Sequence, residues 1–116
     1  MTTYKIKSYA KVNLSLNIIR KKKNGLHEIE SIVTFLKLHD KIKIKEIKRK
    51  KNKVIFSGKF SKNIPKKNTV SHLLDILEKN KYLKNKKYKI NILKNIPQKS
   101  GMGGGSMNAS SILIFL

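Results

Sequence analysis

Residues 97–109 read Pro97-Gln98-Lys99-Ser100-Gly101-Met102-Gly103-Gly104-Gly105-Ser106-Met107-Asn108-Ala109, with four glycines in five positions. The segment before them alternates polar and apolar residues and the segment after them is apolar, which predicts a strand, a loop and a helix in this order. Glycines allow positive φ and close approach of N–H groups to a ligand, and the first turn of a helix adds free amides and a partial positive charge. We therefore expect the loop to bind phosphate. A flexible linker is the alternative that its composition leaves open.

Three known loop motifs do not fit this segment. A Walker A loop ends in Gly-Lys-Ser/Thr, and no lysine follows these glycines. A dinucleotide-binding fingerprint needs a glycine where Ser106 stands, and a nucleophile elbow needs one at Asn108. The hydroxyl of Ser106 can form a hydrogen bond with a phosphate oxygen or with a Mg²⁺-bound water, or it can cap a helix that begins beside it.

The chain is strongly basic, with 28 Lys+Arg against 6 Asp+Glu and a net charge of +22. A nucleic-acid-binding surface is one explanation, because basic groups release counterions from phosphates. The explanation we favour is A/T-rich coding, since only Arg20 and Arg49 are arginines while Lys, Ile and Asn are all abundant. Arginine is the better residue for bidentate phosphate and guanine contacts. We expect no specific nucleic-acid partner.

Length and composition favour one small domain. A chain of 116 residues with 39% apolar residues can form one modest core. There is no cysteine, which excludes disulfides, thiolate zinc sites and cysteine nucleophiles. No apolar run approaches the roughly 20 residues that span a bilayer, and the N-terminus lacks a signal-peptide core. We expect a cytoplasmic protein, or one of a plastid-type compartment if the source is eukaryotic, with no membrane partner.

Hydrophobic periodicity predicts a mixture of strands and helices. Alternating or continuous apolar residues predict strands, the first ones arranged as a meander, at 11–18, 27–38, 41–47, 54–56 and 86–93. Asn24-Gly25 is a strong hairpin signal between the first two. Helical spacing predicts a helix from Thr69 to about Asn80, capped by Asn68 or Thr69. A second helix should open at about Ser106 and expose the apolar residues 112–116, so we expect a chain cut inside a helix.

The glycine-rich segment resembles the phosphate-binding motif of the GHMP kinases, usually Pro-x3-Gly-Leu-Gly-(Gly)-Ser-Ser-(Asp/Asn)-Ala. A second segment, Ala10-Lys-Val-Asn-Leu-Ser-Leu-Asn-Ile18, resembles the first-strand signature of the branch that acts on 4-diphosphocytidyl-2-C-methyl-D-erythritol. Gly25-Leu-His27 stands where that branch has Gly-Tyr-His, and Leu38-His-Asp-Lys-Ile42 resembles the entry to its next strand. The resemblance implies an α+β fold of the ribosomal protein S5 domain 2 type, with a left-handed βαβ unit. Residues 1–116 would then be the N-terminal, ATP-binding GHMP domain, incomplete at its C-terminal end.

The resemblance also implies a reaction and its residues. ATP with Mg²⁺ would phosphorylate the 2-hydroxyl of 4-diphosphocytidyl-2-C-methyl-D-erythritol, a step of the non-mevalonate isoprenoid pathway. Lys11 would stabilise charge on the attacking oxygen, Asn13 would bind the methylerythritol end, and Leu26 and His27 would contact the cytosine. Asn68 would lie near the adenine or ribose. The residues expected at the ATP phosphates are Pro97, Gln98, Lys99, Ser100, Gly101, Met102, Gly103, Gly104, Gly105, Ser106 and Met107, with Ser106 also near the metal.

Two parts of such an enzyme are not found in this sequence. The family's catalytic aspartate lies beyond the glycine-rich helix, whereas no acidic residue follows Glu78. We expect the C-terminal GHMP domain, which completes the cleft in this family, to lie outside residues 1–116 as well. We therefore expect these 116 residues alone to be inactive or nearly so, and a longer gene product to be an active kinase. A basic nucleic-acid-binding domain with an S5-like fold and a non-catalytic remnant are the alternatives.

Overall fold

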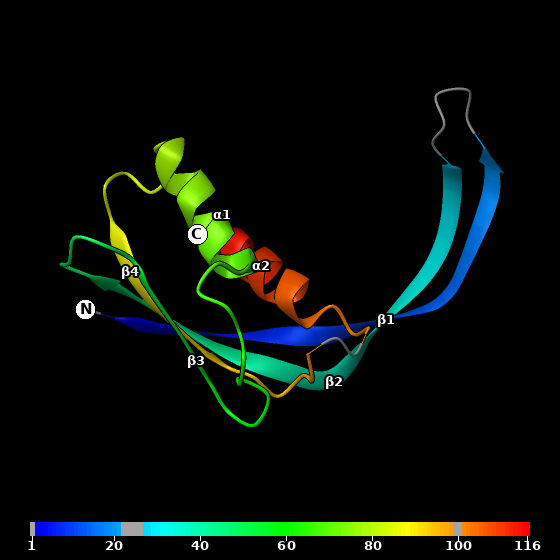
Figure 1. The fold of residues 1–116 in the computed structure, drawn as a ribbon, viewed down its shortest axis with the longest axis horizontal. Helices are drawn as coiled ribbons and strands as arrows, with labels where there is room; N and C mark the ends of the chain where they lie inside the picture. The colour runs from blue at the N-terminus through cyan, green and yellow to red at the C-terminus, as the bar shows by residue number, and fades with distance from the viewer. Residues whose placement is uncertain (1, 22–26, 99–100) are drawn as a thin grey trace.

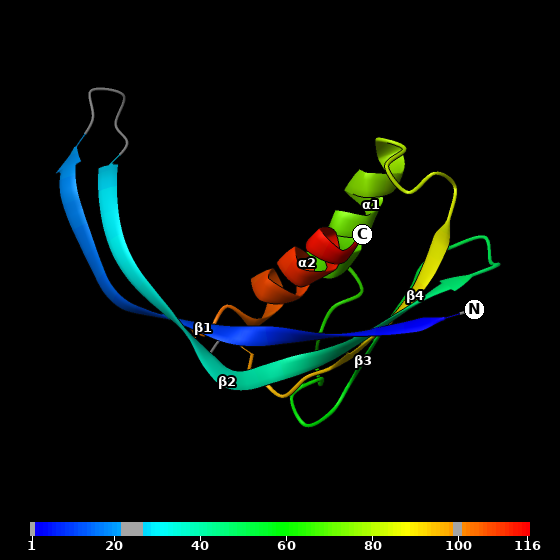
Figure 2. The ribbon, with the colours of Figure 1, turned by 180° about the vertical axis from the view of Figure 1, so that it is seen from behind.

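The computed structural model describes residues 2–21, 27–98 and 101–116, with the side chains of 13–33 excluded. Strands β1 (Thr3–Lys21), β2 (His27–Ile47), β3 (Lys53–Ser57) and β4 (Lys87–Leu93) form one sheet in the order β1-β2-β4-β3. Helices α1 (Thr69–Lys79) and α2 (Gly104–Phe115) both lie on one side of it (Figure 1). The view from behind shows the same two layers (Figure 2). The expected α+β class is confirmed.

The sheet is mixed, because β1–β2 and β2–β4 pair antiparallel whereas β3 and β4 pair parallel. The predicted meander is therefore wrong for β3, which does not pair with β2. A parallel pair needs a long crossover, and α1 supplies it between β3 and β4. The two segments predicted at 27–38 and 41–47 are one continuous strand.

The hairpin between β1 and β2 is confirmed, since Lys21 pairs with His27. Its Asn24-Gly25 turn lies outside the described residues. The far end of the hairpin extends beyond the rest of the sheet as a two-stranded arm (Figure 1). Where the arm meets the rest of the sheet, the N–H of Lys11 in β1 donates to the carbonyl of Met102 in the glycine-rich loop.

The core forms where the helices cover the sheet. The alternation in β2 turns Ile42 and Ile44 toward the helices, and Ile90 and Ile92 of β4 lie beside them, all essentially inaccessible to solvent. The remaining buried apolar residues of this cluster are Val70, Leu74 and Leu77 of α1, Leu83, and Ile112 of α2. Neither helix in the described part of the chain is long and apolar enough to cross a membrane.

Helix α1 has the predicted boundaries and cap. Oδ1 of Asn68 accepts hydrogen bonds from the N–H groups of Val70 (3.1 Å) and Ser71 (3.0 Å), and Ser71 Oγ accepts one from the N–H of Asn68 (2.8 Å). This reciprocal capping box satisfies amides that a helix start leaves free. It fixes the first turn of α1 beside the glycine-rich loop.

Helix α2 begins earlier than predicted. Its first residue is Gly104 and its N-cap is Gly103, so Ser106 lies inside the first turn and is not the cap. Ile112 is fully buried against the core, contrary to the expectation of an exposed end, whereas residues 113–116 are exposed. The early start matters because it places the amides of three consecutive glycines at the helix N-terminus.

Candidate functional site

The glycine-rich loop has a backbone that glycine makes possible. Gly101 and Gly103 have φ of 75° and 67°, in the left-handed region that costs an L-residue about 1–2 kcal/mol. No side chain caps α2 at Gly103. The first amides of α2 are therefore free of a side-chain acceptor, and the positive end of the helix dipole points into the loop.

Lys11 lies against this loop. The β1–β2 register shifts between Tyr9 and Lys11, and the N–H of Lys11 donates to the carbonyl of Met102 (2.9 Å). A Cβ built on Gly103 would stand 3.6 Å from Cε of Lys11. The irregularity in the sheet thus frees a backbone donor to hold the loop and directs the half-buried lysine side chain along it.

A cleft of about 450 Å³ opens between the loop and the start of α1. Across it, a Cβ on Gly105 would be 3.7 Å from Thr69 Oγ1, so the N-termini of both helices adjoin the same space. None of the lining residues is acidic: Phe56, Ile64, Pro65, Asn68, Thr69, Val70, Lys94, Pro97, Gln98, Gly101, Gly103, Gly104, Gly105, Ser106 and Asn108. Two helix N-termini with free amides, and no acid in the lining, favour an anion here.

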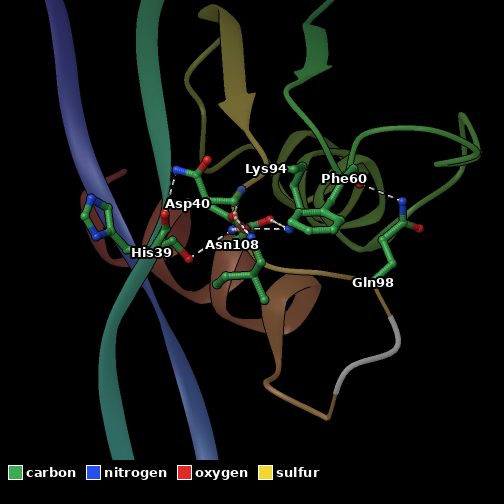
Figure 3. Close-up of polar contacts among 9 residues, drawn as sticks. His39, Asp40, Phe60, Lys94, Gln98 and Asn108 are labelled. Atoms are coloured by element: carbon green, nitrogen blue, oxygen red, sulfur yellow. Dashed lines mark hydrogen bonds and ion pairs between the residues drawn. The ribbon is translucent and has the colours of Figure 1, made fainter.

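A buried polar cluster supports the floor of the cleft (Figure 3). Asp40 of β2 and Lys94, just after β4, form an ion pair of 2.5 Å, and both side chains are at most 4% exposed. Asn108 of α2 accepts from Lys94 Nζ (2.9 Å) and donates to Asp40 Oδ2 (3.0 Å) and Ser8 Oγ (3.0 Å). The cluster joins β1, β2, the end of β4 and α2, so it locks the helix that carries the loop onto the sheet.

Asp40 also holds the segment that leads into the loop. Its Oδ1 accepts from the N–H groups of Asn95 (2.6 Å) and Ile96 (2.9 Å), so the carboxylate accepts four hydrogen bonds in all. A Cβ on Gly104 would lie 3.3 Å from Lys94 Nζ and 3.3 Å from Cγ2 of Ile96, so even an alanine there would be tightly packed. A buried charge requires such complete pairing to be tolerated.

Gln98 ties the loop to the segment before α1. Its Nε2 donates to the carbonyls of Phe60 (2.8 Å) and Lys62 (2.7 Å), as Figure 3 shows for Phe60. Asn68 lines the cleft too, but its side chain is engaged, since Oδ1 caps α1 and Nδ2 donates to Pro65 (2.9 Å). The side chain of Asn68 therefore fixes the backbone at the wall of the cleft.

The structure brings together much of the predicted site. One cleft is lined by eight of the predicted residues: Asn68, Pro97, Gln98, Gly101, Gly103, Gly104, Gly105 and Ser106. The carbonyl of Met102 accepts a hydrogen bond from the N–H of Lys11, and Cγ of Met107 would lie 3.7 Å from a Cβ on Gly103. Lys99, Ser100 and Leu26 lie outside the described residues. Asn13 and His27 lie on the strands of the arm, where side chains are not described.

Sequence reasoning missed Asp40, Lys94 and Ser8 as parts of the site. One signal for Asp40 was available, because the period of two in β2 places it on the same face as Ile42 and Ile44. An acid on a core face needs a buried partner. The partner, Lys94, is 54 residues away and resembles any other lysine in the sequence.

Comparisons with known proteins identify relatives of this chain. The profile of the GHMP kinases N terminal domain matches residues 63–116. The chain is 57% identical over 115 residues to the 4-diphosphocytidyl-2-C-methyl-D-erythritol kinase of Pelagibacter ubique (strain HTCC1062), covering 99% of this chain and 41% of that protein. It is 40% identical over 118 residues to the kinase of the same name from Clostridioides difficile (strain 630), covering 100% of this chain and 38% of that protein. The chain thus spans about two fifths of the length of these curated relatives.

Two solved structures have the same fold. A crystal structure of 4-(cytidine 5'-diphospho)-2C-methyl-D-erythritol kinase superposes with a TM-score of 0.69 at 24% identity, covering 97% of this chain and 39% of that one. A homoserine kinase from Cytophaga hutchinsonii superposes with a TM-score of 0.64 at 17% identity, covering 94% and 32%. At these identities the superpositions are evidence for the fold alone.

Proposed function

The chain has the sequence and the fold of a GHMP kinase N-terminal domain, and from this premise we propose that it supplies the ATP-binding part of a kinase for 4-diphosphocytidyl-2-C-methyl-D-erythritol. The observation that carries the proposal is the contact between Lys11 and the glycine-rich loop, whose glycines line the cleft. The substrate is inferred from the 57% identity to a relative of that name. Residues 1–116 would form the N-terminal domain, and a second domain would complete the cleft.

The cleft would accommodate the triphosphate of ATP. Its free amides at Gly103–Gly105 would bind phosphate oxygens, and the absence of acids from its lining avoids repulsion. Mg²⁺, held mainly by the phosphates themselves with the exposed Ser106 hydroxyl nearby, would neutralise charge on the transferred group. The buried cluster of Asp40, Lys94 and Asn108 would keep the loop in place without touching the reacting atoms.

In the proposed reaction the 2-hydroxyl oxygen forms a bond to the γ-phosphorus while the bond from that phosphorus to the β–γ bridging oxygen breaks. ADP leaves with the electron pair, and the hydroxyl proton passes to a base. The ammonium of Lys11 would stabilise negative charge on the attacking oxygen. The cleft lining contains no carboxylate, so we propose that the base comes from outside residues 1–116.

The acceptor would bind along the β1–β2 arm, which begins at Lys11. Asn13 of β1 would bind the methylerythritol end, and His27 of β2 with the preceding Leu26 would contact the cytosine. This placement follows the resemblance of these positions to the family signature. Leu26 in place of the family tyrosine would give apolar contact without ring stacking.

A chimera tests the function of this chain directly. Residues 1–116 replace the matching N-terminal part of the Pelagibacter ubique relative, and ATP turnover is measured with 4-diphosphocytidyl-2-C-methyl-D-erythritol or homoserine as acceptor. We expect turnover that depends on the first acceptor and not on the second. Lys11→Met should lower kcat by on the order of 10²-fold or more, because a charge acting on the transition state is lost.

The matched control is Lys7→Met, which removes the same charge from the exposed, opposite face of the same strand. It should leave kcat within about twofold. A folded chimera without acceptor-dependent turnover, or equal losses for the two variants, would contradict the proposal.

A further inference from the structure

The face of the sheet that no described helix covers is built from lysine. Along β1, β2 and β4 the residues facing away from the helices alternate with buried ones. In register across β1 and β2, Lys5 is opposite Lys43 and Lys7 is opposite Lys41. Farther along, Lys45 is opposite Lys89, which is also opposite Lys53 of β3. We call these seven residues the lysine face: Lys5, Lys7, Lys41, Lys43, Lys45, Lys53 and Lys89.

The acidic residues with described side chains all lie elsewhere. Asp40 is buried in the polar cluster, and Glu46 lies on the helix side of β2, paired with Lys86 at 3.7 Å. Asp75 and Glu78 belong to α1. Like charges directly opposite one another in a sheet are destabilising. The lysine face therefore gains stability from any bound polyanion that screens its cross-strand repulsion.

The lysine face is also hollowed. A depression of about 770 Å³ is lined by Lys5, Lys7, Lys41 and Lys43 together with Ile55, Asn91 and Leu93. Its floor is thus partly apolar while its rim is cationic. Such a site suits a ligand that has flat apolar parts joined by anionic groups, which is the chemistry of a nucleic-acid strand.

An aromatic pair adjoins the depression. Tyr9 and His39 are paired across β1 and β2 one step beyond Lys7 and Lys41, with ring centroids 5.4 Å apart. Tyr9 is 39% exposed. Rings beside a basic groove are the feature with which proteins stack unpaired bases, whereas duplexes hide their base faces. On this face Ile55 and Leu93 line the hollow and are half-buried, so neither can insert into a bilayer, whereas the exposed ring of Tyr9 can stack on a base.

We propose that the lysine face binds single-stranded nucleic acid without sequence preference, with phosphates on the lysines and one base on Tyr9. The proposal does not rest on the kinase assignment, because the phosphate cleft lies on the helix side of the sheet. It also does not conflict with A/T-rich coding, since the arrangement of the lysines rather than their number defines the surface.

The test uses the 116-residue chain and fluorescein-labelled U12 RNA and T12 DNA, with binding measured by fluorescence anisotropy at several salt concentrations. We expect Kd values of about 10⁻⁴ to 10⁻⁶ M near physiological salt for both strands. Lys41→Gln/Lys43→Gln should lower the slope of log K against log[salt] by about 1.4, because each lost phosphate contact removes about 0.7. Lys50→Gln/Lys51→Gln, in the exposed turn after β2, makes the same charge change and should leave the slope unaltered.

Two further variants complete the design. Tyr9→Leu should weaken binding roughly tenfold at fixed salt, because a stacking contact is lost. The slope of log K against log[salt] should stay the same, because no charge is removed. Should Lys41→Gln/Lys43→Gln lose its native circular dichroism, Lys5→Gln/Lys7→Gln on the neighbouring strand tests the same face.

Several results would overturn the proposal. Equal slope changes for the lysine-face and turn variants would mean that net charge alone binds the strand. Equal affinity for a duplex RNA of the same length, or an unaffected Tyr9→Leu variant, would remove the role of unpaired bases. Binding to phosphatidylserine vesicles through these lysines without binding to U12 or T12 would assign the face to a membrane.

Discussion

Replacing Asp40 by asparagine, an isosteric change, should strongly destabilise the chain. Asp40 is fully buried and accepts four hydrogen bonds, one of them from the buried ammonium of Lys94. The amide keeps the size of the side chain but leaves Lys94 without a counter-charge. Removing one partner of a buried ion pair costs about 3–5 kcal/mol. A domain of this size is stable by only about 5–15 kcal/mol, so about a fifth or more of its stability would be lost.

The assay is urea unfolding followed by far-ultraviolet circular dichroism, carried out on wild type, Asp40→Asn, Lys94→Met and the double variant. In the double variant no charge is left unpaired, so its loss should be smaller than the sum of the two single losses by about 2–3 kcal/mol. An Asp40→Asn loss below about 1 kcal/mol, or additive losses, would refute the assignment of Asp40 and Lys94 as a buried, mutually dependent pair.

Three smaller changes probe the loop and the helices, each by the shift in urea midpoint. Gly103→Ala should cost about 1 kcal/mol because the φ of Gly103 is 67°. Gly105→Ala should stabilise the chain by about 0.5–1 kcal/mol, because Gly105 is helical and the new Cβ would lie 3.7 Å from Thr69 Oγ1. The reverse order of the two effects would contradict the loop geometry. Asn68→Ala should cost about 0.5–2 kcal/mol, since the capping box is lost, and an unchanged midpoint would argue against the cap. Leu74→Ala should cost about 2–5 kcal/mol because Leu74 is only 2% exposed, whereas Ile76→Ala, at a 44% exposed position, should change stability by no more than about 0.5 kcal/mol. Similar losses for the two variants would mean that the buried face of α1 is assigned wrongly.

Sequence patterns predicted α1 and the β1–β2 hairpin correctly, because contacts between residues close in sequence define both. The spacing of Val70, Leu74 and Leu77 and the cap at Asn68 define α1 within one residue of its observed end. The Asn24-Gly25 signal correctly joined β1 to β2, because a hairpin is closed by neighbours in sequence.

Pairings between distant residues were not predictable from periodicity. β3 reads like one more strand of a meander, and only the crossover through α1 brings it beside β4. The sequence pattern divides β2 near Asp40, because residues 27–38 are more continuously apolar whereas residues 41–47 alternate. The strand continues through that position since Lys94, far along the chain, neutralises the carboxylate inside the protein.

The start of α2 was misplaced for a related reason. Glycine is a poor helix former, so the sequence favours Ser106 as the first helical residue. In the structure Gly104 and Gly105 are helical, because Asn108 is fastened to Asp40 and Lys94 beneath them. Tertiary contacts thus override the local propensity and place free amides where the proposed phosphate binding would require them.

The most direct test of the phosphate cleft is a titration of the ¹⁵N-labelled chain with Mg-ATP, following backbone amide shifts by NMR. The account predicts saturable shifts at Gly103, Gly104 and Gly105 and at the amide of Lys11, which is bonded to the same loop. Lys43, on the opposite side of the sheet, should shift little. If these glycine amides stay unmoved at saturating nucleotide, or only the lysine face responds, the loop is not the phosphate site.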